Sequence, residues 1–183
     1  MPTVKDIVVI GVTGSIAAYK IADLVSKLTA EDIPVQVILT DNGARFVGPQ
    51  TFFTLSRRPV ITSLWETTDW KPEHIELADR ARLLVIAPAT ADILAKMACG
   101  LADDALSTFC LSHDGPVLVA PAMNPRMWKH PATQANVKTL RKRGVIFLGP
   151  ATGKVACGEY GQGRMVEVPE ILQAIKEQLN ARQ

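Results

Sequence analysis

The sequence predicts an α/β fold, a doubly wound, Rossmann-like (flavodoxin-like) parallel sheet with helices on both faces, in one domain spanning 1–183. Apolar, largely β-branched runs of strand length recur at 7–12, 35–40, 83–87 and 117–120, as strands buried on both faces require. Stretches with helical apolar spacing separate these runs, and such alternation indicates parallel βαβ units. A chain of 183 residues is long enough to bury a full hydrophobic core.

The first βαβ unit is the most regular part of the sequence. The run Ile7–Val12 leads through Thr13-Gly14-Ser15 into a helix, and the run at 35–40 completes the unit. Apolar residues of this helix fall on one face: Ala17, Ile21, Leu24, Val25 and Leu28. Residues 41–56 are expected to form short helical pieces, and 59–61 either a short strand or a connection. The pattern is weak at 62–71, which contains Trp65 and Trp70.

The second half continues the alternation. Helices are predicted over 91–99, from Asp103 or Asp104 to Cys110, over 133–143 and around 171–179, with a fifth strand at 145–148. Gly100 is expected to cap the first of these helices. Pro88 and Pro121 are expected to stop the strands that precede them, because proline cannot donate to a ladder.

A glycine-rich segment at about 151–166 is expected to be a lid. Gly158, Gly161 and Gly163 follow Cys157 closely, which suggests a mobile flap that carries a thiol over a ligand. An ordinary surface loop whose glycines serve its turns is the alternative.

Composition excludes several classes of protein. The net charge of +2 predicts no nucleic-acid partner. No apolar run approaches the ~18 residues that a membrane span needs. Three cysteines without metal-type spacing favour a reducing cytoplasm and no metal site, and the opening residues predict no signal peptide. Cys99 and Cys110 are expected to be buried, inert thiols.

In open parallel sheets ligands bind beyond the carboxyl ends of the strands. Thr13-Gly14-Ser15 lies between a strand and a helix, where free amides favour a phosphate, although a plain tight turn has the same form. A third glycine is missing, so a mononucleotide is favoured over a nicotinamide dinucleotide.

Two further residues, Asn124 and His74, could each have a functional or a structural role. Asn124 offers an amide that can anchor a carboxylate, or it caps a helix that begins at Pro125, and both roles can coexist. His74 precedes a strand, so it belongs to the amino end of the sheet, and its spacing alone favours a structural or surface role. His74 would reach the carboxyl-end site only from a neighbouring subunit, or if its connecting segment ran along the sheet to that end.

Five stretches, in this order, resemble the flavin-dependent cysteine decarboxylase family over essentially the whole chain. They are 11–20, 74–77, 87–92, 121–124 and 156–165. The resemblance implies FMN, with its phosphate at Gly14 and Ser15. The cofactor-binding residues that it implies are Thr13, Gly14, Ser15, Thr40, Pro88, Ala89, Thr90, Ala91 and Ala122.

The resemblance also implies a reaction, the decarboxylation of 4'-phosphopantothenoylcysteine to 4'-phosphopantetheine in coenzyme A biosynthesis. The substrate thiol would be oxidised to a thioaldehyde, carbon dioxide would leave, and the enethiol would be reduced. His74 would serve oxidation and decarboxylation, as a base or by orienting the substrate, and Cys157 would supply a proton to the enethiol. Asn124 would hold the substrate carboxylate; the other implied substrate-binding residues are Met123, Gly158, Arg164 and Met165.

The family further implies a homo-oligomer, a trimer or dodecamer, with sites at subunit contacts where a neighbour could supply His74. A phosphopantothenoylcysteine synthetase, fused in many bacteria, is the implied partner. Three alternatives remain: a peptidyl-cysteine decarboxylase, which would stop at the enethiol, a non-catalytic flavoprotein regulatory subunit, and a nicotinamide oxidoreductase.

Overall fold

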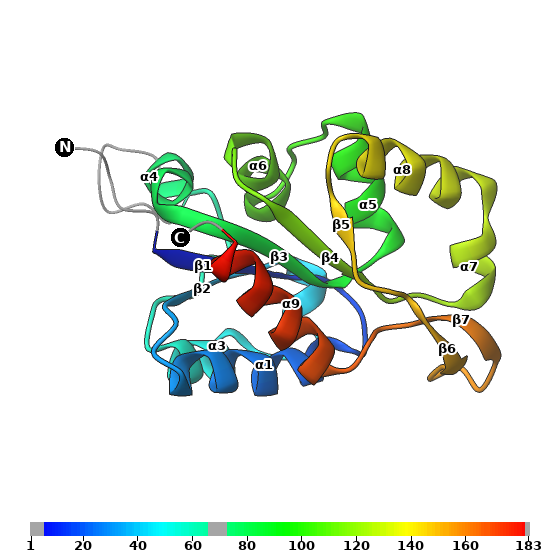
Figure 1. Cartoon of the computed structure of the whole chain (residues 1–183), viewed down its shortest axis with the longest axis horizontal. Helices are drawn as coiled ribbons and strands as arrows, with labels where there is room; N and C mark the ends of the chain where they lie inside the picture. The colour runs from blue at the N-terminus through cyan, green and yellow to red at the C-terminus, as the bar shows by residue number, and fades with distance from the viewer. Residues whose placement is uncertain (1–5, 66–72, 182–183) are drawn as a thin grey trace.

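A five-stranded parallel sheet in the order β2-β1-β3-β4-β5 forms the centre of the molecule (Figure 1). The structure is a computed structural model that describes residues 6–65 and 73–181, with only the backbone described at 73–75. The strands are β1 Ile7–Val12, β2 Val35–Leu39, β3 Ala81–Ala89, β4 Val117–Pro121 and β5 Ile146–Phe147. The order reverses between β1 and β3, which is where such sheets bind ligands. The predicted fold class is confirmed.

Helices cover both faces of this sheet. In Figure 1, α1, α3 and α9 lie along one face, and α4, α5, α6 and α8 along the other. The helices are α1 Ala18–Ala30, α2 Asp41–Ala44, α3 Pro49–Ser56, α4 Glu73–Arg80, α5 Ala91–Cys99, α6 Ala105–Ser112, α7 Pro125–Lys129, α8 Pro131–Lys142 and α9 Val168–Asn180. The expected helical pieces within 41–56 are α2 and α3, and Gly100 caps α5 in the left-handed conformation as predicted.

Alternating residues of each strand enter separate cores, which explains the unbroken apolar runs. In β1, Val8 and Ile10 pack toward α1 and α9, while Ile7 and Val9 pack toward α4 and α6. These four side chains are all buried. β2 departs from this pattern at Gln36, whose side-chain amide donates to the Pro59 carbonyl at 2.6 Å.

β4 ends at Pro121 as predicted, whereas Pro88 does not stop β3, contrary to the prediction. β3 continues to Ala89 and β4 to Pro121, and these two residues pair in the ladder. The register shifts between Ile86 and Ala89, so Pro88 lies in an irregular stretch where no amide is required of it. β5 is shorter than the predicted 145–148, and Ile61 makes only an isolated bridge to Ile38.

Helix α4 was not predicted, because it has only eight residues and few of them are apolar. It runs directly into β3 and so lies at the amino end of the sheet, far from the β6–β7 end in Figure 1. Residues 66–72, including Trp70 in the stretch of weak pattern, lie outside the described part of the chain.

The segment predicted as a lid loop is an antiparallel hairpin. Its strands are β6 Ala151–Lys154 and β7 Tyr160–Arg164, and Cys157 lies in the turn between them. Glycine-rich strands carry little apolar pattern, so the sequence did not reveal them. Among the described residues, no helix is long and apolar enough to span a membrane.

Candidate active site

The hairpin folds back over the carboxyl end of β4. The Met123 amide donates to the Gly163 carbonyl at 2.9 Å, which fixes β7 against the segment that links β4 to α7. A Cβ on Gly163 would lie 2.3 Å from the Met123 carbonyl oxygen, and one on Gly161 would lie 2.9 Å from the Pro125 side chain. These two glycines therefore allow the hairpin backbone to approach the segment after β4 closely.

Asn124 joins the two segments through its side chain. Its Oδ1 accepts from the Arg126 amide at 2.8 Å and so caps α7. Its Nδ2 donates to Cys157 Sγ at 3.2 Å and to Glu159 Oε2 at 3.0 Å. The expected capping role is confirmed, and the same side chain leaves its amide nitrogen for contacts across the site.

Cys157 and Asn124 line a cavity of about 390 Å³ between the hairpin and the start of α1. Ser15, Ala122, Met123, Arg164 and Met165 also line it, so the structure brings these predicted residues together. Met165 is buried and anchors β7 in the core below. The cavity is the place where a ligand could contact both the amide and the thiol.

The charge of this cavity is positive. Its lining contains Lys20, Lys154 and Arg164 and no acidic residue. Glu167, at the start of α9, pairs with Lys20 at 2.8 Å and also with Arg164. The hydrogen bond from Lys20, followed by that from Arg164, holds the pKa of the Glu167 carboxyl below its usual range. One carboxylate thus offsets two cations, and the lining retains positive charge suited to an anionic ligand.

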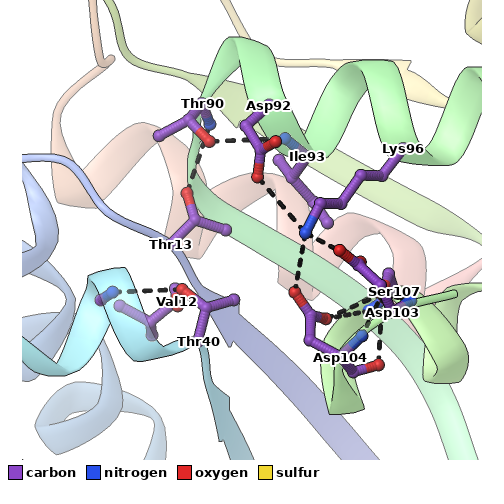
Figure 2. Close-up of polar contacts among 11 residues, drawn as sticks. Val12, Thr13, Thr40, Thr90, Asp92, Ile93, Lys96, Asp103, Asp104 and Ser107 are labelled. Atoms are coloured by element: carbon purple, nitrogen blue, oxygen red, sulfur yellow. Dashed lines mark hydrogen bonds and ion pairs between the residues drawn. The ribbon is translucent and has the colours of Figure 1, made fainter. Parts of the chain in front are cut away.

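A second cavity of about 430 Å³ lies at the ends of β1, β2 and β3, and Figure 2 shows polar contacts of its lining side chains. Predicted cofactor residues line it: Thr13, Gly14, Thr40, Thr90 and Ala91. The Thr13 hydroxyl donates to the Pro88 carbonyl at 2.6 Å and accepts from the Thr90 amide at 3.3 Å. These bonds tie the ends of β1 and β3 together at the point where the strand order reverses.

The rim of the second cavity carries an ionic network (Figure 2). Lys96 Nζ lies 2.8 Å from Asp103, 3.1 Å from Asp104 and 3.6 Å from Asp92. Burial lowers the pKa of Lys96, but the hydrogen bonds to Asp103 and Asp104 outweigh it and raise that pKa above the ordinary lysine value. Three carboxylates around one ammonium leave this rim negative, opposite in sign to the first cavity.

Four helices begin where β1, β2, β3 and β4 end, and α1 differs from the others. Side chains of Thr40, Thr90 and Asn124 cap α2, α5 and α7. The N-cap of α1 is Ala17, which has no side-chain acceptor, and its first turn has no acidic residue. The first amides of α1 bond within the turn instead, that of Ala17 to Ser15 Oγ at 3.3 Å and that of Ala18 to the Ser15 carbonyl at 2.9 Å. With no acidic side chain in its first turn, the positive end of the α1 dipole still favours an external anion beside Ser15.

Several predicted residues lie outside both cavities. Pro88 and Ala89 are buried in β3, and Gly158 is exposed in the hairpin turn with φ of 86°. The backbone of His74 lies in α4 at the amino end, and its side chain is outside the described residues. The single chain therefore does not bring His74 to Asn124 and Cys157.

Sequence reasoning missed the charged residues that surround the site. Glu159, Arg126 and Glu167 were not singled out, although Glu159 pairs with Arg126 at 2.7 Å. Glu159 follows Cys157 by two positions, and this proximity was the available signal. In the ionic network at Lys96, the pair of Asp92 and Lys96 could have been recognised from the sequence, because the two residues are four positions apart on a helix.

The prediction of a buried, inert thiol is wrong for Cys99. Cys99 is exposed, because it ends α5 where the helix turns outward at Gly100. Cys110 is partly exposed as a residue, yet burial of its thiol raises its pKa to about 12. Within the described part of the chain, no group of three or more histidine, cysteine or acidic residues could hold a metal ion.

Comparisons with known proteins find relatives that match most of the chain. The Flavoprotein family model matches residues 2–180. The coenzyme A biosynthesis bifunctional protein CoaBC of Vibrio vulnificus is 46% identical over 172 residues, which are 93% of this chain and 43% of that protein. CoaBC of Mycobacterium tuberculosis is 48% identical over 164 residues, which are 90% of this chain and 39% of that protein. The chain thus spans about two fifths of the length of these relatives.

Solved structures match over nearly the whole chain. A PPC decarboxylase mutant complexed with pantothenoylaminoethenethiol aligns with a TM-score of 0.84 and 31% identity, covering 96% of this chain and 99% of its own. The FMN-dependent cysteine decarboxylase SpaF aligns with a TM-score of 0.80 and 28% identity, covering 97% and 98%.

Proposed function

Because the chain belongs to the Flavoprotein family, we propose that it is an FMN-dependent decarboxylase that converts 4'-phosphopantothenoylcysteine to 4'-phosphopantetheine in coenzyme A biosynthesis. The observation that carries the proposal is the hydrogen bond between Asn124 and Cys157, made across a positively charged cavity beside the start of α1. An amide that can hold a carboxylate and a thiol that can give a proton meet there.

FMN fits the residues at the carboxyl edge. Its phosphate is assigned to Gly14 and Ser15 at the start of α1, since that helix lacks a side-chain cap of its own. The acidic rim of the second cavity disfavours phosphate, so that cavity is assigned to the uncharged ring, beside Thr40, Thr90 and Ala91. Ala122, which lines the first cavity, is assigned to the ring from that side. Pro88 and Ala89 are buried in β3 and support the wall of the second cavity from behind.

The substrate is assigned to the first cavity. Asn124 Nδ2 donates to its carboxylate, and Met123 and Met165 supply apolar contact along its arm. Arg164 contributes positive charge toward the anionic substrate. Gly158 lies in the hairpin turn beside Cys157, where only backbone can contact a ligand.

Bound FMN would supply the two-electron oxidation of the substrate thiol to a thioaldehyde and would return the electrons after loss of carbon dioxide. Cys157 supplies the proton that the enethiol needs during reduction. The hydrogen bond from Asn124 to Cys157 Sγ stabilises the thiolate that remains. The hairpin covers this step with protein, because β7 packs directly on Met123 and Pro125.

His74 is assigned to the oxidation and decarboxylation half of the reaction, as a base or by orienting the substrate. Helix α4 lies at the far end of its own sheet, so a neighbouring subunit is proposed to supply the residue. This requires a homo-oligomer, a trimer or dodecamer, with its sites at subunit contacts. A phosphopantothenoylcysteine synthetase, in line with the bifunctional CoaBC relatives, is the proposed partner, and a cytoplasmic location completes the proposal.

The experiment is to load the purified chain with FMN and supply 4'-phosphopantothenoylcysteine. Yellow protein that releases carbon dioxide and 4'-phosphopantetheine in equal amounts is the expected result. Release of carbon dioxide with only an unreduced enethiol would favour a peptidyl-cysteine decarboxylase, and folded protein that does not take up flavin would contradict the proposal.

A further inference from the structure

Both amide hydrogens of Asn124 are already in use. A side-chain amide nitrogen has two N–H groups, and here one reaches Cys157 Sγ and the other Glu159 Oε2. The oxygen of the same amide accepts from the Arg126 backbone. No N–H of Asn124 is left for the carboxylate that the proposed function assigns to it.

We propose that Glu159 stands in for the substrate carboxylate on Asn124, and that substrate binding displaces it. The inference rests on the proposed function, since it needs Asn124 to bind a carboxylate. Glu159 Oε2 lies 3.0 Å from Asn124 Nδ2, the contact that a substrate carboxylate would make. Glu159 is thus a positioning residue that holds the amide ready and yields it to a group of the same chemistry.

After its displacement from Asn124, the Glu159 carboxylate still has an ion-pair partner. The other oxygen of its carboxylate pairs with Arg126 at 2.7 Å, and the Arg126 side chain is 85% exposed. Two carboxylates cannot share one amide nitrogen without repulsion, so an arriving carboxylate must move Glu159. Arg126 can follow the displaced carboxylate into solvent, because among the described residues its guanidinium pairs with Glu159 alone.

The hairpin keeps its position without Glu159. The bond between the Met123 amide and the Gly163 carbonyl holds β7, and Gly161 packs on Pro125. The side chain of Glu159 is about one third exposed, at 34%, so removing its charge empties no core position. A change at Glu159 is therefore expected to alter ligand binding and to leave the fold intact.

The test uses FMN-loaded protein and two ligands that cannot turn over. The serine analogue 4'-phosphopantothenoylserine carries the carboxylate and lacks the thiol, and 4'-phosphopantothenoylethanolamine lacks both. Calorimetry gives both dissociation constants for the unchanged chain, Glu159→Gln, Glu159→Ala and the exposed control Glu177→Gln.

Both Glu159 variants should bind the serine analogue about tenfold more tightly, because one charge-assisted hydrogen bond no longer has to be broken. They should bind the ethanolamine analogue with the same Kd as the unchanged chain, and Glu177→Gln should change neither constant. With the true substrate, KM should fall in both Glu159 variants, a change that a merely structural role would not produce.

The outcomes separate the two proposals. If the unchanged chain prefers the serine analogue and neither Glu159 variant binds it more tightly, the displacement inference is wrong and the proposed function stands. Weaker binding of both analogues by the variants would also overturn it, since Glu159 would then be structural. If the unchanged chain binds neither analogue and does not release carbon dioxide from 4'-phosphopantothenoylcysteine, the proposed function fails and the inference with it.

Discussion

The side-chain amide of Asn124 donates to the sulfur of Cys157 at 3.2 Å, although the two residues lie 33 positions apart. Asn124 is held at the end of β4 because its oxygen caps α7, and Cys157 is brought to it by a hairpin that packs on the same segment. The proposed function assigns these residues to different steps, carboxylate binding and protonation. Their variants should therefore fail at different points of the reaction.

Replacing Cys157 by serine should separate decarboxylation from reduction. A serine hydroxyl is a far weaker acid than a thiol, so the enethiol should lose its proton donor while carbon dioxide still leaves. We expect carbon dioxide release close to that of the unchanged chain and formation of 4'-phosphopantetheine slowed by about 100-fold or more. Mass spectrometry should detect a product two hydrogens short of 4'-phosphopantetheine. Normal 4'-phosphopantetheine formation would remove Cys157 from this role.

Replacing His74 by asparagine should block the first half of the reaction. We expect carbon dioxide release to fall by about 100-fold or more, the range of a lost general base, while the flavin absorbance of the loaded protein is retained. The matched control is His130→Asn, since His130 caps α8 through its ring nitrogen and asparagine can cap in its place. Full turnover by the His74 variant would contradict its assignment.

Mixing two variants that are each deficient in 4'-phosphopantetheine formation tests whether a neighbour supplies His74. A site built from the Cys157 of a His74→Asn subunit and the His74 of a Cys157→Ser subunit would be complete. Subunits denatured and refolded together should therefore regain part of the 4'-phosphopantetheine formation that neither variant has alone. If His74 acts within its own chain, the mixture should remain as inactive as its components.

Gly163→Ala should displace the hairpin. The added Cβ would lie 2.3 Å from the Met123 carbonyl oxygen, and φ at this position is 154°. We expect a stability loss of about 1–3 kcal/mol in urea unfolding, typical of a strained backbone position. Formation of 4'-phosphopantetheine should fall by about 100-fold, as expected for a misplacement of about 1 Å. Gly48→Ala is the control, because a Cβ there meets nothing within 4 Å.

The local features of the site could be predicted from the sequence. The cap at Asn124 and the helix stop at Gly100 depend on neighbours within a few positions, and the structure has them where the pattern indicates. The parallel order of the sheet follows in the same way from buried runs that alternate with helices.

Features that depend on distant contacts could not be predicted. The hairpin strands are glycine-rich and become strands by pairing with each other against Met123 and Pro125, so no periodicity marks them. In the sequence, Glu159 is an ordinary acidic residue in a polar stretch. Only the fold brings its carboxylate to the side-chain amide of Asn124. β3 passes through Pro88 because the register shift there needs no amide, a property of the neighbouring strand and not of the local sequence.

The ionic network at Lys96 makes a prediction about acid stability. The hydrogen bond from Lys96 holds the pKa of the Asp103 carboxyl below its usual value. A carboxyl whose pKa is lower in the folded than in the unfolded chain stabilises the fold above the unfolded pKa, about 4, and loses this effect as pH falls through the folded value. Asp103→Asn should therefore be less stable than the unchanged chain at pH 7, and the difference should shrink as pH falls below about 4. Urea midpoints measured across this range provide the test, with the exposed Asp32→Asn as control. A difference that stays constant with pH would show that the Asp103 charge does not contribute.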